Sequence, residues 1–192
     1  MGRWIEAEES LHRALALAPE LPEAHHNLGT LRHDEDRLEE AVTCYRRALT
    51  LRPAFASALY NLANVLRELG RVEEAEPYAR HAKELAPDDA KATVVLADVL
   101  QDLDHFSEAL SYYDQIFSPR PKGEGSVVRD AEAQRNRAFC LLASGNLTEG
   151  WMAYAARQAL LKPLSLTHGE WTGIENLDGK TIIGTAGARV RG

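Results

Sequence analysis

Seven histidines are the residues of this chain best suited to bind a metal ion or to transfer protons. Three of them, His25, His26 and His33, lie close together along one expected helix. His26 and His33 are about two helical turns apart, too far for one ion, and His25 points to another side of the helix. The carboxylate of a zinc-protease motif is absent from this stretch. We therefore expect surface or groove histidines, with no metal site and no cofactor.

The two cysteines, Cys44 and Cys140, indicate neither catalysis nor a disulfide framework. They lie far apart in the sequence, so neither a zinc-binding spacing nor a disulfide pattern is present. Neither stands next to a base in a recognisable motif, and no serine lies in a nucleophile elbow. Cys44 falls among the apolar positions of its helix and is expected to be a small buried side chain. We expect reduced thiols, a cytoplasmic protein and no catalytic residue.

Three asparagines, Asn27, Asn61 and Asn136, recur at one position of successive helical segments. An asparagine amide carries both a donor and an acceptor, so a row of them could hydrogen bond the backbone of an extended peptide. The same amides could instead tie neighbouring helices together, and Val95 interrupts the row, so both interpretations stay open. The predicted peptide-binding residues of this face are Asn27, Asn61, Asn64, Tyr60, His26, Arg67, Lys91 and Asp98.

The charge and hydrophobicity of the chain argue against two other classes of partner. Its formal charge is −7, whereas sequence-independent binding to nucleic acid requires clustered Lys and Arg. No run approaches the roughly 18 apolar residues that span a bilayer, and the first residues lack a signal-peptide pattern. The hydrophobic content of 45% is enough to bury a core. We therefore predict a protein that binds neither nucleic acid nor a membrane.

A repeat with a period of 34 residues, marked by Pro19, Pro53 and Pro87, carries these side chains. Between the prolines, apolar residues recur at spacings of three and four, which gives each helix one apolar face. The segments "HDEDR", "ELGR" and "DLDH" interrupt the pattern, and Gly or Asp can adopt the turn conformation there. Each period is therefore a predicted helical hairpin, and the fold class is all-α.

Small residues recur at two further positions of the period. They are Gly29, Ala63 and Ala97 in the first helices, and Ala41, Ala75 and Ala109 in the second helices. Small side chains let two helices approach closely, and a large one would overpack the contact at a cost of about 1 to 3 kcal/mol. One hairpin cannot bury both of its apolar stripes. Neighbouring hairpins must therefore stack, and we predict a right-handed α-α superhelix with a concave inner face.

The segment "EAHHNLGTLRHDEDRLEEAVTCYRRALTLRP" resembles a tetratricopeptide repeat throughout its length. The resemblance implies an array over residues 1–118, with a half repeat at 2–19 and repeats at 22–53, 56–87 and 90–118, whose first helices line the concave face. The asparagine row is similar to that of O-linked N-acetylglucosamine transferases, which implies contact with a peptide main chain. The basic clamp of chaperone-binding repeats is absent, because Arg67 and Lys91 stand among acids.

The array opens with the second helix of a hairpin, which leaves Trp4, Leu11 and Leu15 expected to be partly exposed. We infer a fragment of a longer protein, or a face that something else covers. Self-association through this helix is one form of the second expectation.

After the array, residues 119–129 are predicted to form a linker, 130–161 a degenerate fourth hairpin and 162–192 a short irregular tail. The tail contains one β-branched run, Thr181 to Ile183, which as a lone strand cannot form a sheet. The segments "GNLTEGWMAYAAR" and "EWTGIENLDGKTII" resemble the junction where bacterial tetratricopeptide repeats lead into a glycosyltransferase-like domain. That family's glycine-rich and acidic stretch is not recognisable in "GTAGARVRG".

Two functions are therefore considered. The first is a non-enzymatic scaffold that binds an extended peptide or a partner helix in the concave groove. The alternative is the substrate-recruiting arm of a truncated, sugar-nucleotide-dependent glycosyltransferase whose catalytic part is absent.

Overall fold

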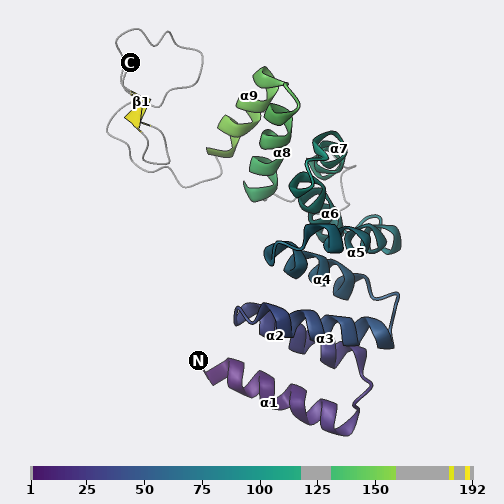
Figure 1. Ribbon diagram of the computed structural model, residues 1–192. Helices are drawn as coiled ribbons and strands as arrows, with labels where there is room; N and C mark the ends of the chain where they lie inside the picture. Colours follow the sequence, from purple (N-terminus) through teal and green to yellow (C-terminus); the bar gives the residue numbers. More distant parts are fainter. Residues whose placement is uncertain (1, 118–130, 159–181, 184–188, 191–192) are drawn as a thin grey trace, which may run out of the picture. The chain divides into compact units, whose positions relative to one another are not determined.

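A computed structural model describes residues 2–117, 131–158, 182–183 and 189–190, and the chain divides into two compact units, 1–128 and 129–192. In its described part, the first unit consists of helices (Figure 1). These helices are α1 (Gly2–Leu17), α2 (Pro22–Asp34), α3 (Leu38–Leu51), α4 (Ala56–Glu68), α5 (Val72–Leu85), α6 (Ala90–Asp102) and α7 (Phe106–Phe117). The second unit contains α8 (Ala131–Ala143), α9 (Leu147–Gln158), β1 (Ile182–Ile183) and β2 (Arg189–Val190).

The first unit repeats one helical hairpin, seen in α2 with α3, α4 with α5 and α6 with α7 (Figure 1). Helix α1 packs on α2 and has the sequence of a second hairpin helix. The helices α1, α3 and α5 each end two residues before Pro19, Pro53 or Pro87, because the residue before a proline is pushed out of the helical conformation. The recurring prolines therefore set the length of each second helix.

The turn inside each hairpin uses one residue in the left-handed conformation. Asp36, Gly70 and Asp104 have φ angles of 60°, 74° and 62° and lie at equivalent positions of the three hairpins. After each of them the chain closes the turn with a backbone hydrogen bond, such as Arg71 N to Leu66 O at 2.8 Å. Glycine and aspartate tolerate this conformation better than most residues. The turns that the sequence predicted are thereby confirmed.

The recurring alanines lie in the core between helices. Ala41, Ala75 and Ala109 are 0% exposed, as are Ala63 and Ala97. Burial at both predicted positions confirms that helices meet at small side chains. The large core residues surround these contacts, with Leu62, Leu66, Leu96, Leu100, Tyr45 and Tyr113 all at most 1% exposed.

Gly29 marks the tightest of these contacts. A β-carbon added there would lie 2.8 Å from both Cδ1 and Cε1 of Tyr45, whose ring is fully buried. The middle hairpin has alanine at both equivalent positions, Ala63 and Ala79. The third hairpin combines Ala97 with the buried Tyr113, so the tight fit between Gly29 and Tyr45 is a property of the first hairpin's own packing.

Replacing Gly29 with alanine should lower the free energy of unfolding by about 1 to 2 kcal/mol, because overpacking outweighs the gain in helix propensity. In a Tyr45→Ala background the same change should instead stabilise by about 0.5 to 1 kcal/mol, since the ring is gone. Urea unfolding followed by circular dichroism measures all four members of the cycle. Equal effects of Gly29→Ala in both backgrounds would contradict the steric explanation.

The hairpins stack with their two helices in unequal roles. First helices contact one another directly, α2 with α4 and α4 with α6. The second helices are linked through ion pairs between long side chains. Arg46 of α3 pairs with Glu74 of α5, and Arg80 of α5 pairs with Glu108 of α7. Close contact on one side and long side chains on the other make the stack curve, with the first helices inside. The first unit is thus the right-handed α-α superhelix that the sequence predicts.

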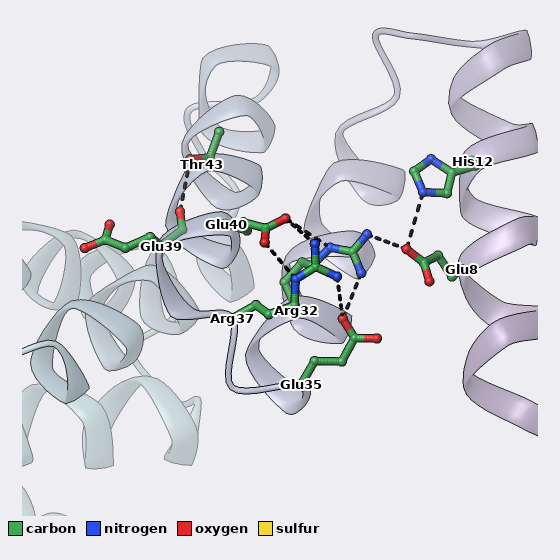
Figure 2. A network of polar contacts seen from close by, with 8 residues as sticks. All are labelled: Glu8, His12, Arg32, Glu35, Arg37, Glu39, Glu40 and Thr43. Atoms are coloured by element: carbon green, nitrogen blue, oxygen red, sulfur yellow. Dashed lines mark hydrogen bonds and ion pairs between the residues drawn. The ribbon is translucent and has the colours of Figure 1, made fainter. Parts of the chain in front are cut away.

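The contact between α1 and α2 is centred on a buried arginine. Figure 2 shows Arg32 of α2 between Glu8 of α1, Glu35 at the end of α2 and Glu40 of α3. Arg32 is only 6% exposed, and its nitrogens lie 2.5 Å, 2.8 Å and 3.6 Å from the carboxylates of Glu8, Glu35 and Glu40. Burial disfavours the charged guanidinium, but its hydrogen bonds to Glu8 and Glu35 outweigh burial and raise the pKa of Arg32.

The other hairpins place a fully buried leucine where the first has Arg32, namely Leu66 and Leu100. Arg32→Leu should therefore keep the free energy of unfolding within about 1 kcal/mol or raise it, because buried ion pairs are often replaceable by apolar side chains. Arg32→Ala should lower it by about 2 to 3 kcal/mol, since the volume is lost together with the charge. Urea unfolding of both variants tests this difference. Equal losses for leucine and alanine would show that the ion pairs themselves are required.

The second unit contains a hairpin of the same kind. Helices α8 and α9 pack together, and Gly145 takes the left-handed turn position with φ of 82°. Gly150 is buried, and an added β-carbon there would lie 2.7 Å from Leu142 Cδ2, so this glycine also serves a close helix contact. Arg137 donates to Glu149 across the hairpin at 3.3 Å.

The tail differs from the sequence prediction in one respect. Strand β1 pairs antiparallel with β2, with Ile182 opposite Val190 and Ile183 opposite Arg189. The prediction that the β-branched run stays without a partner strand is therefore wrong, because the tail itself supplies the second strand. The predicted linker at 119–129, and the rest of the tail at 162–181, 184–188 and 191–192, lie outside the described residues.

Candidate functional site

All eight predicted peptide-binding residues lie on α2, α4 and α6, the first helices of the three hairpins. We call the side of these helices that carries them the inner face. It has polar contacts between side chains 35 residues apart, His26 with Asn61, His33 with Glu68 and Arg67 with Asp102. The repeat thus brings side chains from successive first helices together at regular intervals.

The best-defined cluster of the inner face is built around His26. Its Nδ1 lies 3.2 Å from Oδ1 of Asn27, and its Nε2 lies 3.1 Å from Nδ2 of Asn61 on α4. The ring also packs near two aromatic rings, with centroids 5.7 Å away for Tyr45 and 5.0 Å away for Phe55. His26 therefore contacts α3, α4 and the connection before α4, and it is half-buried.

One protonation state satisfies both hydrogen bonds of His26. A carboxamide oxygen only accepts, so Nδ1 must donate to Asn27, and an amide nitrogen donates, so Nε2 must accept from Asn61. The neutral ring with its proton on Nδ1 meets both conditions. Burial lowers the pKa of His26 and favours the same neutral state, although Asn27 and Glu23 act in the opposite direction.

Tyr45 supports this cluster from the core. Its hydroxyl donates to Thr30 Oγ1 at 3.2 Å, and burial raises the pKa of Tyr45 to about 12. The phenol therefore stays protonated at physiological pH, and an uncharged ring packs beside His26. Neither Tyr45 nor Phe55 was among the predicted site residues. The spacing of 35 residues between His26 and Asn61 is the sequence signal that could have revealed their contact.

A second polar group surrounds Arg67. Its Nη1 donates to Asp102 at 3.3 Å, and its Nη2 donates to Asn64 Oδ1 at 3.4 Å. Asn64 in turn donates from Nδ2 to Glu68 at 2.6 Å, and Glu68 also contacts His33 at 2.9 Å. Both ends of the Asn64 amide are thus engaged within its own helix. The charges of this group largely pair with one another.

The remaining predicted residues differ in accessibility. Asn27 and Lys91 are exposed, Asn61 is half-buried, and Tyr60 is half-buried against the core residues Leu59, Ala82 and Ala92.

Asp98 does not fit the prediction for a groove residue. It is only 7% exposed and accepts a hydrogen bond from the buried Tyr113 hydroxyl at 2.5 Å. Asp98 therefore belongs to the packing of α6 on α7. In the second unit Asn136 is also 7% exposed, so the asparagine position is buried there.

The other candidate chemistry can be placed as well. Cys140 is buried, whereas Cys44 is half-buried, less buried than predicted, and burial raises the pKa of its thiol. In the described part of the chain, no three His, Cys, Asp or Glu side chains gather as they would around a metal ion. No described helix combines the length and apolar character needed to cross a bilayer.

Comparison with known proteins identifies the repeat. Residues 29–70 match a family model described as TPR repeat, and residues 55–118 match one described as tetratricopeptide repeat. Residues 29–118 contain tetratricopeptide repeats. No curated protein matches the chain.

Three solved structures illustrate the similarity of fold. YrrB, described as a TPR protein with an unusual peptide-binding site, has a TM-score of 0.64 at 24% identity, covering 78% of this chain and 73% of YrrB. MamA from residue 41 to its end, from Desulfovibrio magneticus RS-1, has a TM-score of 0.68 at 16% identity, covering 83% of this chain and 88% of the MamA chain. PilF of Pseudomonas aeruginosa has a TM-score of 0.63 at 22% identity, covering 84% of this chain and 68% of the PilF chain. These TM-scores show that the chain shares the fold of the three structures, including the TPR protein YrrB.

Stability should fall at acid pH because of His26. Burial puts its folded-state pKa below the ordinary 6.5, so the unfolded chain binds the proton more readily. The contribution of neutral His26 is fully present above about pH 6.5 and is lost as pH falls toward the lower folded pKa. Between about pH 7.5 and pH 5.5 the wild type should lose more stability than His26→Gln.

Urea unfolding of both proteins at the two pH values measures this difference. The six other histidines are present in both chains, so their titration cancels in the comparison. The same loss in wild type and variant would show that His26 is as easily protonated in the folded protein as in the unfolded one.

Proposed function

We propose that the chain is a non-enzymatic binding module whose inner face takes an extended polypeptide segment of another protein. The observation that carries the proposal is the pair Asn27 and Asn61, two amides on successive first helices that meet at one histidine. Each amide uses one end on His26, which leaves its other end for a ligand. Amides with spare hydrogen-bonding capacity suit the N–H and C=O groups of an extended main chain.

The charges of the inner face favour recognition of main chain over recognition of charged groups. His33 pairs with Glu68, and Arg67 pairs with Asp102. A ligand carboxylate would have to displace Asp102 from Arg67, and a ligand ammonium would have to displace His33 from Glu68. The first exchange replaces one ion pair by another with little net gain, and the second breaks the hydrogen bond between His33 and Glu68. The fold similarity to YrrB, which has a peptide-binding site, is consistent with this use of the inner face.

Tyr60 and Lys91 complete the proposed site. Tyr60 offers an aromatic surface beside Asn61, and Lys91 is the exposed cation at the start of α6. An aromatic side chain supplies contact area to a bound segment at low entropic cost. The net charge of −7 makes nucleic acid a poor partner for the same surface.

Two further expectations from the sequence stay predictions. Self-association through α1 agrees with the exposure of its described side chains, since residues 8–17 are exposed or half-buried. The role as arm of a glycosyltransferase depends on a resemblance whose second segment, at 170–183, lies outside the described residues except for 182–183. Sequence beyond Gly192 that encodes two Rossmann-type halves would favour that alternative.

Asn61→Ala together with Asn64→Ala should raise the Kd for a peptide selected on the wild type by about tenfold or more, because hydrogen bonds to the peptide main chain are lost. Helicity should be unchanged. Isothermal calorimetry with a peptide from a random library gives the Kd, and Thr50→Ala on the exposed surface of α3 is the matched control. Unchanged affinity in the double variant would remove the inner face as the binding site.

A further inference from the structure

We propose that His26 is a positioning residue that fixes the Asn61 amide with its carbonyl oxygen toward the ligand, while Asn27 presents its amide N–H group. The inner face would thereby offer one acceptor and one donor, which match the N–H and the C=O of an extended main chain. This inference rests on the proposed function, because it assigns the groups that the bound segment contacts.

The chain of hydrogen bonds determines the direction of each group. Asn27 Oδ1 is an acceptor and lies 3.2 Å from His26 Nδ1, which places the ring proton on Nδ1. The unprotonated Nε2 then accepts from Asn61 Nδ2 at 3.1 Å. Because a carboxamide is planar with nitrogen and oxygen on opposite sides, the Asn61 oxygen is turned away from His26. The Asn27 nitrogen is turned away for the same reason.

The ring itself packs against two aromatic rings, one of which is held by a further pair of charged side chains. Tyr45 of α3 and Phe55 before α4 lie against it, and Arg52 stacks on Phe55 with its guanidinium carbon 4.9 Å from the ring centroid. Glu23 of α2 accepts from Arg52 at 2.5 Å. These contacts oppose a flip of the imidazole, which would put ring carbons in place of both nitrogens and break the hydrogen bonds to Asn27 and Asn61. Burial of His26 beside neutral Tyr45 favours the uncharged ring that the arrangement requires.

Asn64 supplies an internal contrast on the same helix. Its oxygen accepts from Arg67 and its nitrogen donates to Glu68, so neither end waits for a ligand. Asn61 is therefore the amide of α4 that we assign to hydrogen bonding with a ligand, through its carbonyl oxygen. Thr50→Ala, on the exposed surface of α3, is the control for Asn61→Ala, because it removes a polar side chain from a second helix and not from the inner face.

The first test is the tautomer of His26 in the full chain without any ligand. Long-range proton–nitrogen spectra of nitrogen-labelled protein at about pH 7.5 distinguish the two neutral tautomers and the imidazolium. The His26 signal is assigned by its loss in His26→Gln. We expect a protonated Nδ1 and an unprotonated Nε2. A proton on Nε2, or a charged ring, would reverse or remove the orientation of Asn61 and overturn the proposal.

The second test uses N-methylated analogues of a peptide selected on the wild type, each with one main-chain N–H replaced. One analogue should lose about tenfold in affinity for the wild type and for Thr50→Ala, and should lose little for Asn61→Ala. The same penalty should shrink in His26→Ala, where the amide keeps its hydrogen bond to Tyr45 but loses the one to His26. A penalty that persists in Asn61→Ala would overturn the assigned acceptor. If the expected tautomer is found but Asn61→Ala leaves peptide affinity unchanged, the proposed function fails while the orientation of the amide stands.

Discussion

The close approach of helices at small side chains is the constraint on which the rest of this structure depends. Ala41, Ala75 and Ala109 have no exposed surface, and Gly29 leaves only the room that the Tyr45 ring fills. At such distances a helix pair has little freedom to slide or rotate, because interiors are packed to crystal-like density. Each first helix therefore presents the same side to the interior of the curve. A polar residue of one first helix consequently meets the residue 35 positions later, which follows its counterpart in the next hairpin, as His26 meets Asn61.

Charge is used where this packing leaves gaps. The outer helices are joined by Arg46 with Glu74 and by Arg80 with Glu108, which are exposed enough to contribute modestly. At the next equivalent position of the repeat, after Arg46 and Arg80, the sequence has Asp114 in place of an arginine. Arg32 is the one core position where the first hairpin uses a charge and the later hairpins use leucine. Specific partners across α1, α2 and α3 hold it there, which ties the position of α1 to particular side chains.

Much of the fold could be predicted from the sequence, because the period, the prolines and the small residues all act locally. Turn residues such as Asp104 and core residues such as Tyr113 follow from that period directly. The site was harder to predict, because residues at equivalent positions of the repeat can have different neighbouring side chains. Asn27 is exposed, Asn61 is half-buried and Asn136 is buried. These differences depend on which side chains arrive from neighbouring helices, and a repeat pattern does not encode that.

The alternation of Tyr45, Ala79 and Tyr113 illustrates how neighbours decide the role of a polar residue. In the first and third hairpins the tyrosine hydroxyl donates to a side chain 15 residues earlier, on the first helix of the same hairpin. This residue is Thr30 in the first hairpin and Asp98 in the third. The middle hairpin has alanine there, so no such hydroxyl reaches the equivalent residue, Asn64, which instead bonds Arg67 and Glu68. Thr30 and Asn64 are both half-buried, whereas Asp98 is buried, so the tyrosine alone does not decide how exposed this position is. A single change from tyrosine to alanine between repeats instead changes the hydrogen-bond partners of one position, without any change in the backbone fold.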